Sequence, residues 1–474
     1  MSAVSEMREK LRGFIAERRA EMLRDLAALV ELPSVAKPGK DGLPYGAECR
    51  EVLRRAEAIA RKLGFVTEIH DDAVMTVRWD EREPSFCAMA HLDVVPAGEG
   101  WTTPPYELTV ETDCIRGRGV TDDKGPAIAA LYAMAAVREL CPRLSAPPML
   151  WLGTAEEIGS GDLKHYLKSH RLPPCVITPD AVDAIVIGEC AKYRPAVSAA
   201  WKRSDALPRV THLQGGRVRN AIPAEASATV AGLTADEVRE IAQAWTAQTE
   251  VAFTLTDTAE GLAIRATGRG AHIGKPCLGR NAQTALVELL SKLPLADCGS
   301  ARAIRAMARC FPYADPYGEA LGLTVEDAVM GKCRINATTC MLHEEGVALQ
   351  FDGRGGALAT EENFARVIDR ALTAAGFTVE KSEMDAAHFV PPEAEIVQEM
   401  SAIWRAVRGC EPAVVSMVAG SYAHFVPGAI AVGRAAPGID CRIHKSDEWL
   451  PLADFDRLVE LLALAMLRFG GENV

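Results

Sequence analysis

One histidine and several carboxylates stand at two predicted junctions in the first third of the chain, and their types suit a metal site. His91 and Asp93 end the short apolar run 86–90, which predicts a buried strand. Side chains two residues apart on an extended chain point the same way, so this pair would lie side by side. Asp122 and Asp123 precede an alanine-rich stretch that predicts a helix. In isolation, such pairs are more often a structural hydrogen bond and a helix cap.

Further candidates follow two other predicted strands and recur near the end of the chain. Glu156 and Glu157 come directly after the apolar segment MLWLGT, and Asp180 follows CVIT. Adjacent extended residues face opposite ways, so one glutamate could bind metal while its neighbour addresses substrate. His444 stands in the segment HKSDE. Because chemistry gathers at the carboxyl ends of parallel strands, these side chains are expected to converge there.

Two imidazoles and three carboxylates suit a pair of borderline divalent ions. Water shared by two such ions has a lowered pKa, and a carboxylate that is not a ligand can pass the water's proton to a leaving amine. The pattern therefore predicts amide hydrolysis. The residues of this predicted site are His91, Asp122, Glu157, Asp180 and His444, with Asp93 and Glu156 close by.

The composition is that of an ordinary globular chain and excludes several classes of partner. A chain of 474 residues is too long for one compact core, so more than one domain is expected. The net charge of −12 argues against a nucleic-acid or anionic-membrane partner, because no basic stripe is available to neutralise phosphates. Thirteen cysteines without a CxxC pair, and an N-terminus without an apolar signal region, predict reduced thiols and a cytoplasmic location. No apolar run is long enough to predict a membrane span.

The chain changes character twice. Residues 1–190 alternate helices with short apolar strands, which is typical of an α/β layer with a largely parallel sheet. Residues 191–385 contain two similar passages of strand, strand, helix and strand, which predict two small α+β units in an inserted lobe. Residues 386–474 return to α/β character. Predicted helices cover 8–31, 47–63, 124–139, 160–168, 394–408 and 452–468, and predicted strands cover 73–79, 85–90, 148–153, 175–178 and 429–433.

Five motifs, in order, carry a resemblance: HLDVVPAGEGWTTPPY, GRGVTDDKGP, EEIGSGD, TPDA and HKSDE. Together they resemble the dinuclear metallopeptidase superfamily of carboxypeptidase G, ArgE/DapE deacylases, aminoacylases and carnosinases. Within it, the chain is most similar to PepV-like Xaa-His dipeptidases. The resemblance implies an α/β catalytic domain with a mixed, mostly parallel sheet, formed by residues 1–190 and 386–474. It also implies an inserted α+β lid domain of two similar parts at 191–385.

The resemblance also implies how the ligands divide. His91, Asp122 and Asp180 would hold one ion, and Asp122, Glu157 and His444 the other, with Asp122 bridging. Zinc is the expected metal, and manganese and cobalt are alternatives, because mixed nitrogen and oxygen ligands suit all three.

Further roles follow from the same resemblance. Glu156 matches the general base, and Asp93 matches the carboxylate that fixes the tautomer of a metal-bound His91. The resemblance implies a cis peptide after Asp122. His272, in the inserted lobe, resembles a lid histidine that stabilises the tetrahedral oxyanion.

Four residues resemble substrate contacts. Asn220 resembles a substrate-contacting asparagine, and Arg354 an arginine that grips the substrate carboxylate. The turn 419–422, with Gly420 and Ser421, resembles a substrate-carboxylate loop. Ala155 departs from the family, which usually has Asp before the glutamate pair, and this loss could loosen the base or change metal preference.

Three functions remain open at this point. The leading one is a metal-dependent dipeptidase acting on small peptides, and the second is an N-acyl amino acid deacylase with the same site. The third, an inactive metal- or peptide-binding homologue, is disfavoured because every ligand and the base are present. In relatives with a short lid, the oxyanion histidine comes from a partner subunit. Because one of the two lid units here could replace that partner's lid, the resemblance to the PepV-like branch implies that His272 acts within its own chain and that the protein is a monomer.

Overall fold

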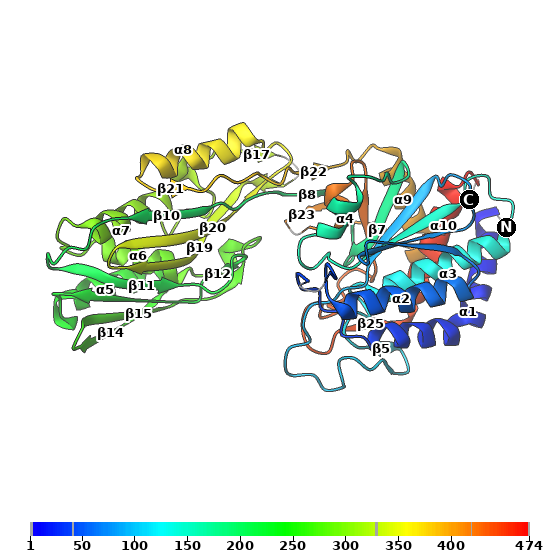
Figure 1. The fold of residues 1–474 in the computed structure, drawn as a ribbon, viewed down its shortest axis with the longest axis horizontal. Helices are drawn as coiled ribbons and strands as arrows, with labels where there is room; N and C mark the ends of the chain where they lie inside the picture. The colour runs from blue at the N-terminus through cyan, green and yellow to red at the C-terminus, as the bar shows by residue number, and fades with distance from the viewer. Residues whose placement is uncertain (1–2, 40–41, 328–329, 419, 473–474) are drawn as a thin grey trace. The chain divides into compact units, whose positions relative to one another are not determined.

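The computed structural model describes residues 3–39, 42–327, 330–418 and 420–472. Two compact units make up the chain. Unit 1 comprises Met1–Gly188, His388–Ser416 and Gly420–Val474, and unit 2 comprises Glu189–Ala387 and Met417–Ala419. In Figure 1, unit 1 runs from blue to cyan and from orange to red, and unit 2 runs from green to yellow. Ala419 of the predicted substrate loop lies outside the described residues.

Unit 1 is built on a mixed sheet with the strand order β1-β2-β6-β3-β7-β24-β8-β22, and β23 pairs with β8. The central strands β6, β3, β7 and β24 are parallel to one another. The pairs β1–β2, β2–β6 and β24–β8 on either side of these strands are antiparallel, so the sheet is mixed around a parallel centre. The strands are β1 Val66–His70, β2 Val74–Arg78, β3 Phe86–His91, β6 Pro148–Gly153, β7 Cys175–Ala181, β8 Ile185–Glu189, β22 His388–Phe389, β23 Val414–Met417 and β24 Ile430–Gly433.

The antiparallel edge starts with a tight hairpin that the sequence analysis did not predict. Asp71 and Asp72 both have positive φ, 51° and 52°, and the Ala73 N–H donates to the His70 carbonyl at 3.0 Å. These are the features of a type I′ turn, which suits the twist of a two-stranded ribbon. Strand β1 is partly exposed, so it lacks the apolar run that marks β2.

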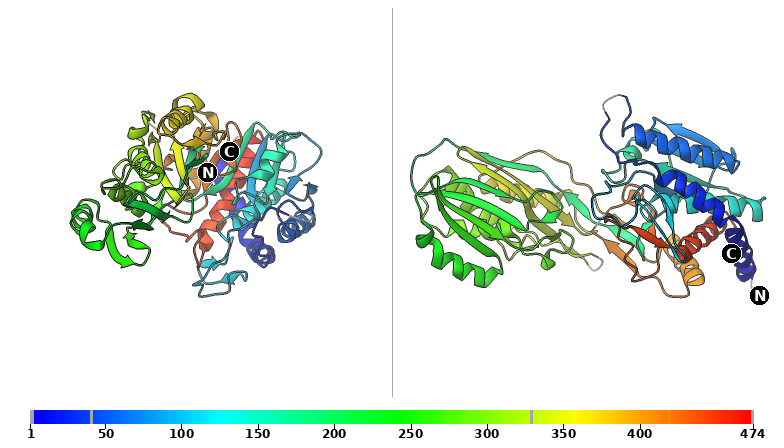
Figure 2. Two further views of the ribbon diagram at one scale, coloured as in Figure 1. Left: turned by 60° about the vertical axis from the view of Figure 1, so that its left-hand side comes forward. Right: turned by 90° about the horizontal axis from the view of Figure 1, so that it is seen from below.

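Both faces of the central strands are buried, and alternate residues explain why. On β3, Phe86, Ala88 and Ala90 join one apolar core, while Cys87 and Met89 join another. The larger core is closed by α1, α2, α3, α9 and α10, and α3 and α10 lie side by side there (Figure 2). The smaller core is closed by α4 and the short helix η4. The helices are α1 Ala3–Val30, α2 Ala47–Lys62, α3 Lys124–Leu140, α4 Gly161–Tyr166, α9 Glu395–Arg408, α10 Leu452–Phe469 and η4 Tyr422–Phe425.

The two α+β units expected in the inserted lobe share one continuous main sheet in unit 2. Its order is β14-β15-β13-β11-β19-β20-β10-β21, and β9 pairs with β20. The strands are β9 Ala191–Tyr193, β10 Ala196–Ala200, β11 Arg209–Gly215, β13 Glu225–Ala231, β14 Ala252–Thr258, β15 Gly261–Thr267, β19 Arg334–His343, β20 Gly346–Gly355 and β21 Thr378–Val379.

The two predicted passages correspond to the two halves of this sheet. One half is β11, β13, helix α5 (Ala235–Thr249) and β14; the other is β19, β20, helix α8 (Arg366–Ala374) and β21. Strand β15 lies between β13 and β14 as β10 lies between β20 and β21, so the order is mirrored about the β11–β19 pair. Pairing of β11 with β19 removes the free edge that each half would otherwise expose.

The remaining elements are short or lie beside these layers. Unit 2 also has α6 Ala282–Ser291, α7 Gly299–Cys310, η1 Pro276–Leu278, η2 Glu319–Leu321, η3 Glu361–Ala365, and the strands β12 Ala221–Ile222, β16 Ala271–His272, β17 Glu326–Asp327 and β18 Gly331–Lys332. Unit 1 also has β4 Thr109–Val110, β5 Cys114–Arg116 and β25 Trp449–Pro451. Within the described part of the chain, no helix combines the length and apolarity needed to cross a bilayer.

Candidate metal centre

Residues that could do chemistry stand together at the carboxyl ends of the central parallel strands of unit 1. His91 is the last residue of β3, and Asp180 lies near the end of the neighbouring strand β7. His91 pairs in register with Gly153, the last residue of β6, so the Glu156–Glu157 pair starts three residues beyond that point. The predicted convergence at the carboxyl ends of parallel strands is therefore present.

A first group of possible ligands consists of His91, Asp122 and Asp180, each offering an atom within 4.8 Å of the others. His91 Nε2 lies 3.2 Å from Asp122 Oδ1. His91 Nδ1 faces Asp93, 2.9 Å from its carbonyl oxygen and 3.3 Å from Oδ1. Because Asp93 engages Nδ1, Nε2 is the ring nitrogen that faces the carboxylates and is available to a metal.

A second group consists of Asp122, Glu157 and His444, again within 4.8 Å. His444 Nε2 lies 2.9 Å from Asp122 Oδ2 and 3.0 Å from Glu157 Oε1. Asp122 thus faces His91 with one oxygen and His444 with the other, which is the arrangement of a bridging carboxylate. The His444 side chain is 51% exposed, and its φ of 61° is uncommon outside glycine.

The two imidazoles have altered proton affinities. Burial lowers the pKa of His444, but its contacts with Asp122 and Glu157 outweigh that effect and raise the pKa to about 10. Burial also opposes the protonated form of His91, while Asp122 and Asp93 raise its pKa well above the usual value. A divalent cation bound to these imidazoles would displace their protons.

The loop that carries Asp122 is fixed by a buried carboxylate that the sequence analysis missed. The expected cis peptide between Asp122 and Asp123 is present. Glu448 accepts the backbone N–H groups of Asp122 at 3.0 Å and Thr121 at 2.9 Å, and Arg118 donates to it at 2.6 Å. Glu448 belongs to the same HKSDE segment as His444, so one segment both carries a possible ligand and holds the Asp122 backbone in place.

The turn bearing the glutamate pair is held by Asp93. Its carboxylate accepts the N–H of Glu156 at 3.2 Å and the N–H of Glu157 at 3.1 Å. Asp93 therefore contacts both the His91 imidazole and the turn. Glu156 belongs to neither ligand group, and burial, with the charge of Asp180 second, raises its pKa well above the usual value.

Asp162, which the sequence analysis also missed, holds Thr154 and Ala155, the two residues before the glutamate pair. Its Oδ2 accepts the N–H of Thr154 at 2.7 Å and of Ala155 at 3.0 Å, and the Tyr422 hydroxyl donates to the same oxygen at 2.6 Å. Gly153 leaves room for this contact, because a Cβ there would lie 2.1 Å from the Tyr422 hydroxyl oxygen. Two buried carboxylates, Asp162 and Asp93, thus fix the four consecutive backbone N–H groups of residues 154–157. Ala155 contributes its N–H to this set but has no carboxylate of its own.

Arg434 is a further residue that the sequence analysis did not single out. It directly follows β24, whose Gly433 pairs with Ala181 of β7, and its N–H donates to the Ala181 carbonyl at 3.1 Å. This position puts a buried guanidinium beside Asp180, with Nη1 2.8 Å from Oδ1. A charged residue at the exit of a predicted parallel strand was the available signal.

Ser421 and Gly420 belong to unit 1. Ser421 is buried and is the N-cap residue of η4, directly before Tyr422. Its hydroxyl accepts the N–H of Ala423 at 3.2 Å. Gly420 is partly exposed.

Asn220 and His272 belong to unit 2 and are neighbours there. Strand β12 pairs with β16, with Ala221 opposite His272, and the Ile273 N–H donates to the Asn220 carbonyl at 3.1 Å. Burial, with the charge of Arg354 second, lowers the pKa of His272.

Arg354, also in unit 2, is buried and already has a carboxylate partner. Its Nε and Nη2 lie 2.7 and 2.9 Å from the two oxygens of Asp352, and Nη1 donates to the Val418 carbonyl. The more exposed Arg194 also contacts Asp352, at 3.1 Å. The guanidinium assigned to a substrate carboxylate is therefore bonded within unit 2.

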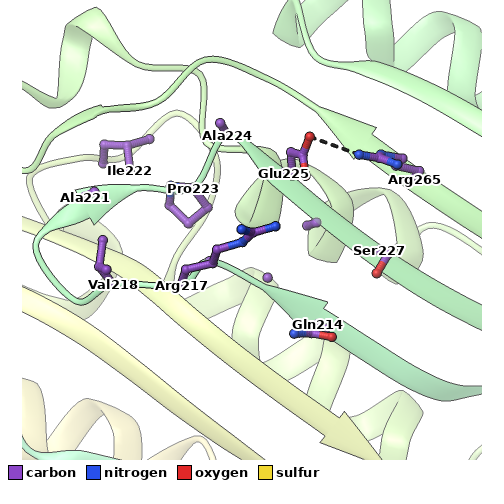
Figure 3. Close-up of a pocket in the computed structure, with 13 residues that line it drawn as sticks. Gln214, Arg217, Val218, Ala221, Ile222, Pro223, Ala224, Glu225, Ser227 and Arg265 are labelled. Atoms are coloured by element: carbon purple, nitrogen blue, oxygen red, sulfur yellow. Dashed lines mark hydrogen bonds and ion pairs between the residues drawn. The ribbon is translucent and has the colours of Figure 1, made fainter. Parts of the chain in front are cut away.

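Unit 2 also contains a pocket of about 650 Å³, shown in Figure 3. The side chain of Arg217 extends into it, and Glu225 pairs with Arg265 at 3.0 Å on its border. It borders the loop that carries Asn220 and includes no predicted site residue. Its lining is polar and charged as well as apolar, and comprises Gln214, Gly215, Gly216, Arg217, Val218, Ala221, Ile222, Pro223, Ala224, Glu225, Ala226, Ser227 and Arg265.

The sequence pattern described as Peptidase family M20/M25/M40 matches residues 87–468. The chain belongs to this family. The matched range includes both ligand groups of this M20 peptidase, from His91 to His444, and the family membership expected from the motifs is confirmed.

Curated relatives of this M20 peptidase match along almost its whole length. YtjP of Bacillus subtilis strain 168, which carries the name dipeptidase, is 26% identical over 465 residues, covering 95% of this chain and 98% of that protein. The Beta-Ala-Xaa dipeptidase of Lactobacillus delbrueckii subsp. lactis is 24% identical over 459 residues, covering 94% of this chain and 95% of that protein.

Solved structures agree with the fold of this M20 peptidase. Human carnosine dipeptidase 1 aligns with a TM-score of 0.57 at 14% identity, covering 98% of this chain and 99% of that one. The confirmed fold is the mixed α/β architecture expected from the sequence.

The donor set of this M20 peptidase fits two divalent cations. Each group offers one imidazole and two carboxylates without a thiolate, and the groups share Asp122. Such mixed nitrogen and oxygen ligands suit borderline divalent metals.

Proposed function

We propose that this M20 peptidase is a metal-dependent dipeptidase that hydrolyses the peptide bond of dipeptides or short peptides. The observation that carries the proposal is the sharing of Asp122, whose two oxygens face His91 and His444 separately, with Glu156 outside both groups. The dipeptidase names of YtjP and of the Lactobacillus relative support the substrate class.

The proposal assigns His91, Asp122 and Asp180 to one ion and Asp122, Glu157 and His444 to the other. Zinc is the favoured metal, and manganese and cobalt are the alternatives. Bound ions would polarise the scissile carbonyl and lower the pKa of water.

Glu156 is proposed as the general base. A carboxyl group with a raised pKa can take a proton from water near neutral pH and return it to the leaving amine. Asp93 is proposed to orient both partners of this step, because it contacts the His91 imidazole and the Glu156 N–H.

The remaining assignments come from the resemblance of the motifs. His272 is proposed to stabilise the oxyanion, and Asn220, Arg354, Gly420 and Ser421 to bind substrate. Because the Arg354 guanidinium is paired with Asp352, its proposed role is indirect: Arg354 fixes the conformation of the part of unit 2 that is proposed to bind the peptide.

The test is hydrolysis by metal-stripped protein reloaded with Zn²⁺ or Mn²⁺, using dipeptides, N-acetyl amino acids and longer peptides. Dipeptides are expected to be cleaved fastest. Faster cleavage of N-acetyl amino acids would support the deacylase alternative, and no hydrolysis with any metal would leave a binding homologue.

A variant of Glu156 tests its assignment as the general base. Glu156→Gln is expected to lower kcat by about 10²–10⁴-fold while bound metal is retained. Glu51→Gln, on the exposed face of α2, is the matched control and should keep full activity. Full activity in Glu156→Gln would remove the assignment.

The protein is further proposed to be a cytoplasmic monomer. The mirrored halves of the unit 2 sheet support a monomer, because the second half can take the place of a partner's lid. Light scattering after gel filtration tests this, and a tight dimer held through unit 2 would contradict it. Fractionation of the host cell tests the location.

A further inference from the structure

Arg434 is a buried cation among the proposed metal ligands. Its Nη1 lies 2.8 Å from Asp180 Oδ1, 3.3 Å from Asp122 Oδ1 and 3.4 Å from Asp123 Oδ1. The guanidinium is 3% exposed. A guanidinium stays charged under all ordinary conditions, so this positive charge is a permanent part of the site.

Apart from Asp123, Arg434 contacts the two carboxylate oxygens that lie on the His91 side of the site, Asp180 Oδ1 and Asp122 Oδ1. Asp122 Oδ1 faces both Arg434 and His91, whereas Asp122 Oδ2 faces His444. Asp180, the other carboxylate of the His91 group, is the nearest partner of Arg434. Among the described residues, Glu157 and His444 have no contact with Arg434 at hydrogen-bond or ion-pair distance.

The two ligand groups therefore offer a cation different electrostatic environments. In the His91 group, a dication must share the oxygens of Asp122 and Asp180 with a fixed positive charge. Like charges in a buried site repel strongly, because little water screens them. The His444 group keeps the full charge of Glu157 and is open to solvent through a half-exposed histidine.

We propose that Arg434 makes the two metal positions unequal. The Asp122–Glu157–His444 position binds its ion tightly, and the His91–Asp122–Asp180 position binds a second ion weakly and reversibly. In metal-stripped protein, Arg434 supplies the counter-charge that keeps the buried carboxylates together. This inference rests on the proposed function, since it takes both groups as metal ligands.

The test measures bound metal directly. Metal-stripped protein is dialysed against chelator-buffered Zn²⁺ over a range of free concentrations, and zinc per chain is counted by mass spectrometry. The wild type is expected to bind a first ion at least about tenfold more tightly than a second. His444→Ala should remove the tight step, and His91→Ala the weak one. Two steps of equal affinity, or the opposite assignment, would overturn the proposal.

Arg434→Met tests the cause. It should tighten the second step by about tenfold or more, and lower the melting temperature of the stripped protein more than that of the loaded protein. If affinity does not change and both melting temperatures fall equally, Arg434 is only structural and the proposal fails. Should this variant not fold, the wild-type steps and the two histidine variants still decide whether the positions are unequal as assigned.

Arg408→Met is the matched control. Arg408 is another buried arginine of unit 1 and pairs with Asp454 at 2.7 Å, outside both ligand groups. Its loss should lower both melting temperatures alike and leave the two binding steps unchanged. Peptide hydrolysis is measured separately. Unequal zinc binding without hydrolysis would contradict only the proposed function. Equal zinc binding with hydrolysis would contradict only the inference about Arg434.

Discussion

The Tyr422 hydroxyl donates a 2.6 Å hydrogen bond to the buried Asp162 carboxylate, across 260 residues of sequence. The same carboxylate oxygen accepts the N–H groups of Thr154 and Ala155, next to the proposed base Glu156. Tyr422 immediately follows the proposed substrate-binding residue Ser421. The hydrogen bond thus joins the segment assigned to substrate with the turn assigned to proton transfer.

Removing this hydrogen bond should slow the reaction without removing metal. In Tyr422→Phe, the Glu156 turn loses part of its support, so kcat should fall by roughly 10- to 100-fold while zinc content stays unchanged. Steady-state kinetics and metal counting check this.

Tyr132→Phe is the matched control for Tyr422→Phe. Tyr132 is equally buried and donates to Asp25 at 2.7 Å, but it lies on α3 outside the site. Equal losses of kcat in the two variants would show that Tyr422 contributes only general stability.

Glu448→Gln should weaken metal binding. The Glu448 carboxylate holds the N–H groups of Thr121 and Asp122, and loss of such support for a ligand typically costs about 10–100-fold in affinity. Competition with a chelating dye measures the change. Glu460→Gln is the control, because Glu460 is also buried and paired, with Arg8, but touches no ligand. Unchanged zinc affinity in Glu448→Gln would refute the assignment.

Lys124→Met should destabilise unit 1. The buried Lys124 ammonium donates to the carbonyls of Leu29 at 2.9 Å and Leu32 at 2.6 Å, at the end of α1. Methionine fills similar space but leaves both carbonyls without this donor, at a cost of roughly 1–3 kcal/mol in unfolding free energy. Denaturant unfolding measures it, with the half-exposed Lys62→Met as control. A neutral result would mean that the cost of burying the ammonium cancels its hydrogen bonds.

The stability of unit 1 should also depend on the protonation of His70. Burial, opposed by the charge of Glu68, lowers the pKa of this imidazole below its usual value. The unfolded chain then binds the proton more readily, so this contribution is present above pH about 6.5 and is lost as the pH falls through the folded pKa. His70→Gln should therefore lose less unfolding free energy on acidification than the wild type. Identical pH slopes would contradict the prediction.

Much of the site was predictable because its ligands follow uninterrupted apolar runs. Phe86–Ala90 and the segment before Glu156 are buried on both faces, and such runs mark central parallel strands whether or not their partners are known. Parallel packing then fixes where His91 and Asp180 must meet. The helices were predictable for a similar local reason, since α3 and α10 are each rich in apolar residues at helical spacing.

The supporting residues were not predictable because their partners are distant in sequence. Asp162 lies in the first turn of α4, where an acidic residue is ordinary, and nothing local links it to Tyr422. Arg434 reads as a solvated charge after a strand, until the register of Gly433 with Ala181 puts it beside Asp180. The β1 edge strand was missed because its side chains are only partly buried, so the alternation of apolar residues is weak.

Gly153 offers the sharpest test of how closely this network is packed. A Cβ at this position would lie 2.1 Å from the Tyr422 hydroxyl oxygen and 2.5 Å from Asp162 Oδ2. Gly153→Ala should therefore cost about 1–3 kcal/mol in unfolding free energy through overpacking, and lower kcat as Tyr422→Phe does. The double variant Gly153→Ala/Tyr422→Phe lacks the hydroxyl that the new Cβ would approach. Its loss of unfolding free energy should therefore be smaller than the sum of the two single losses, with a coupling of about 0.5–3 kcal/mol. Strict additivity in both unfolding and kcat would show that Gly153 does not make room for the Tyr422 hydroxyl.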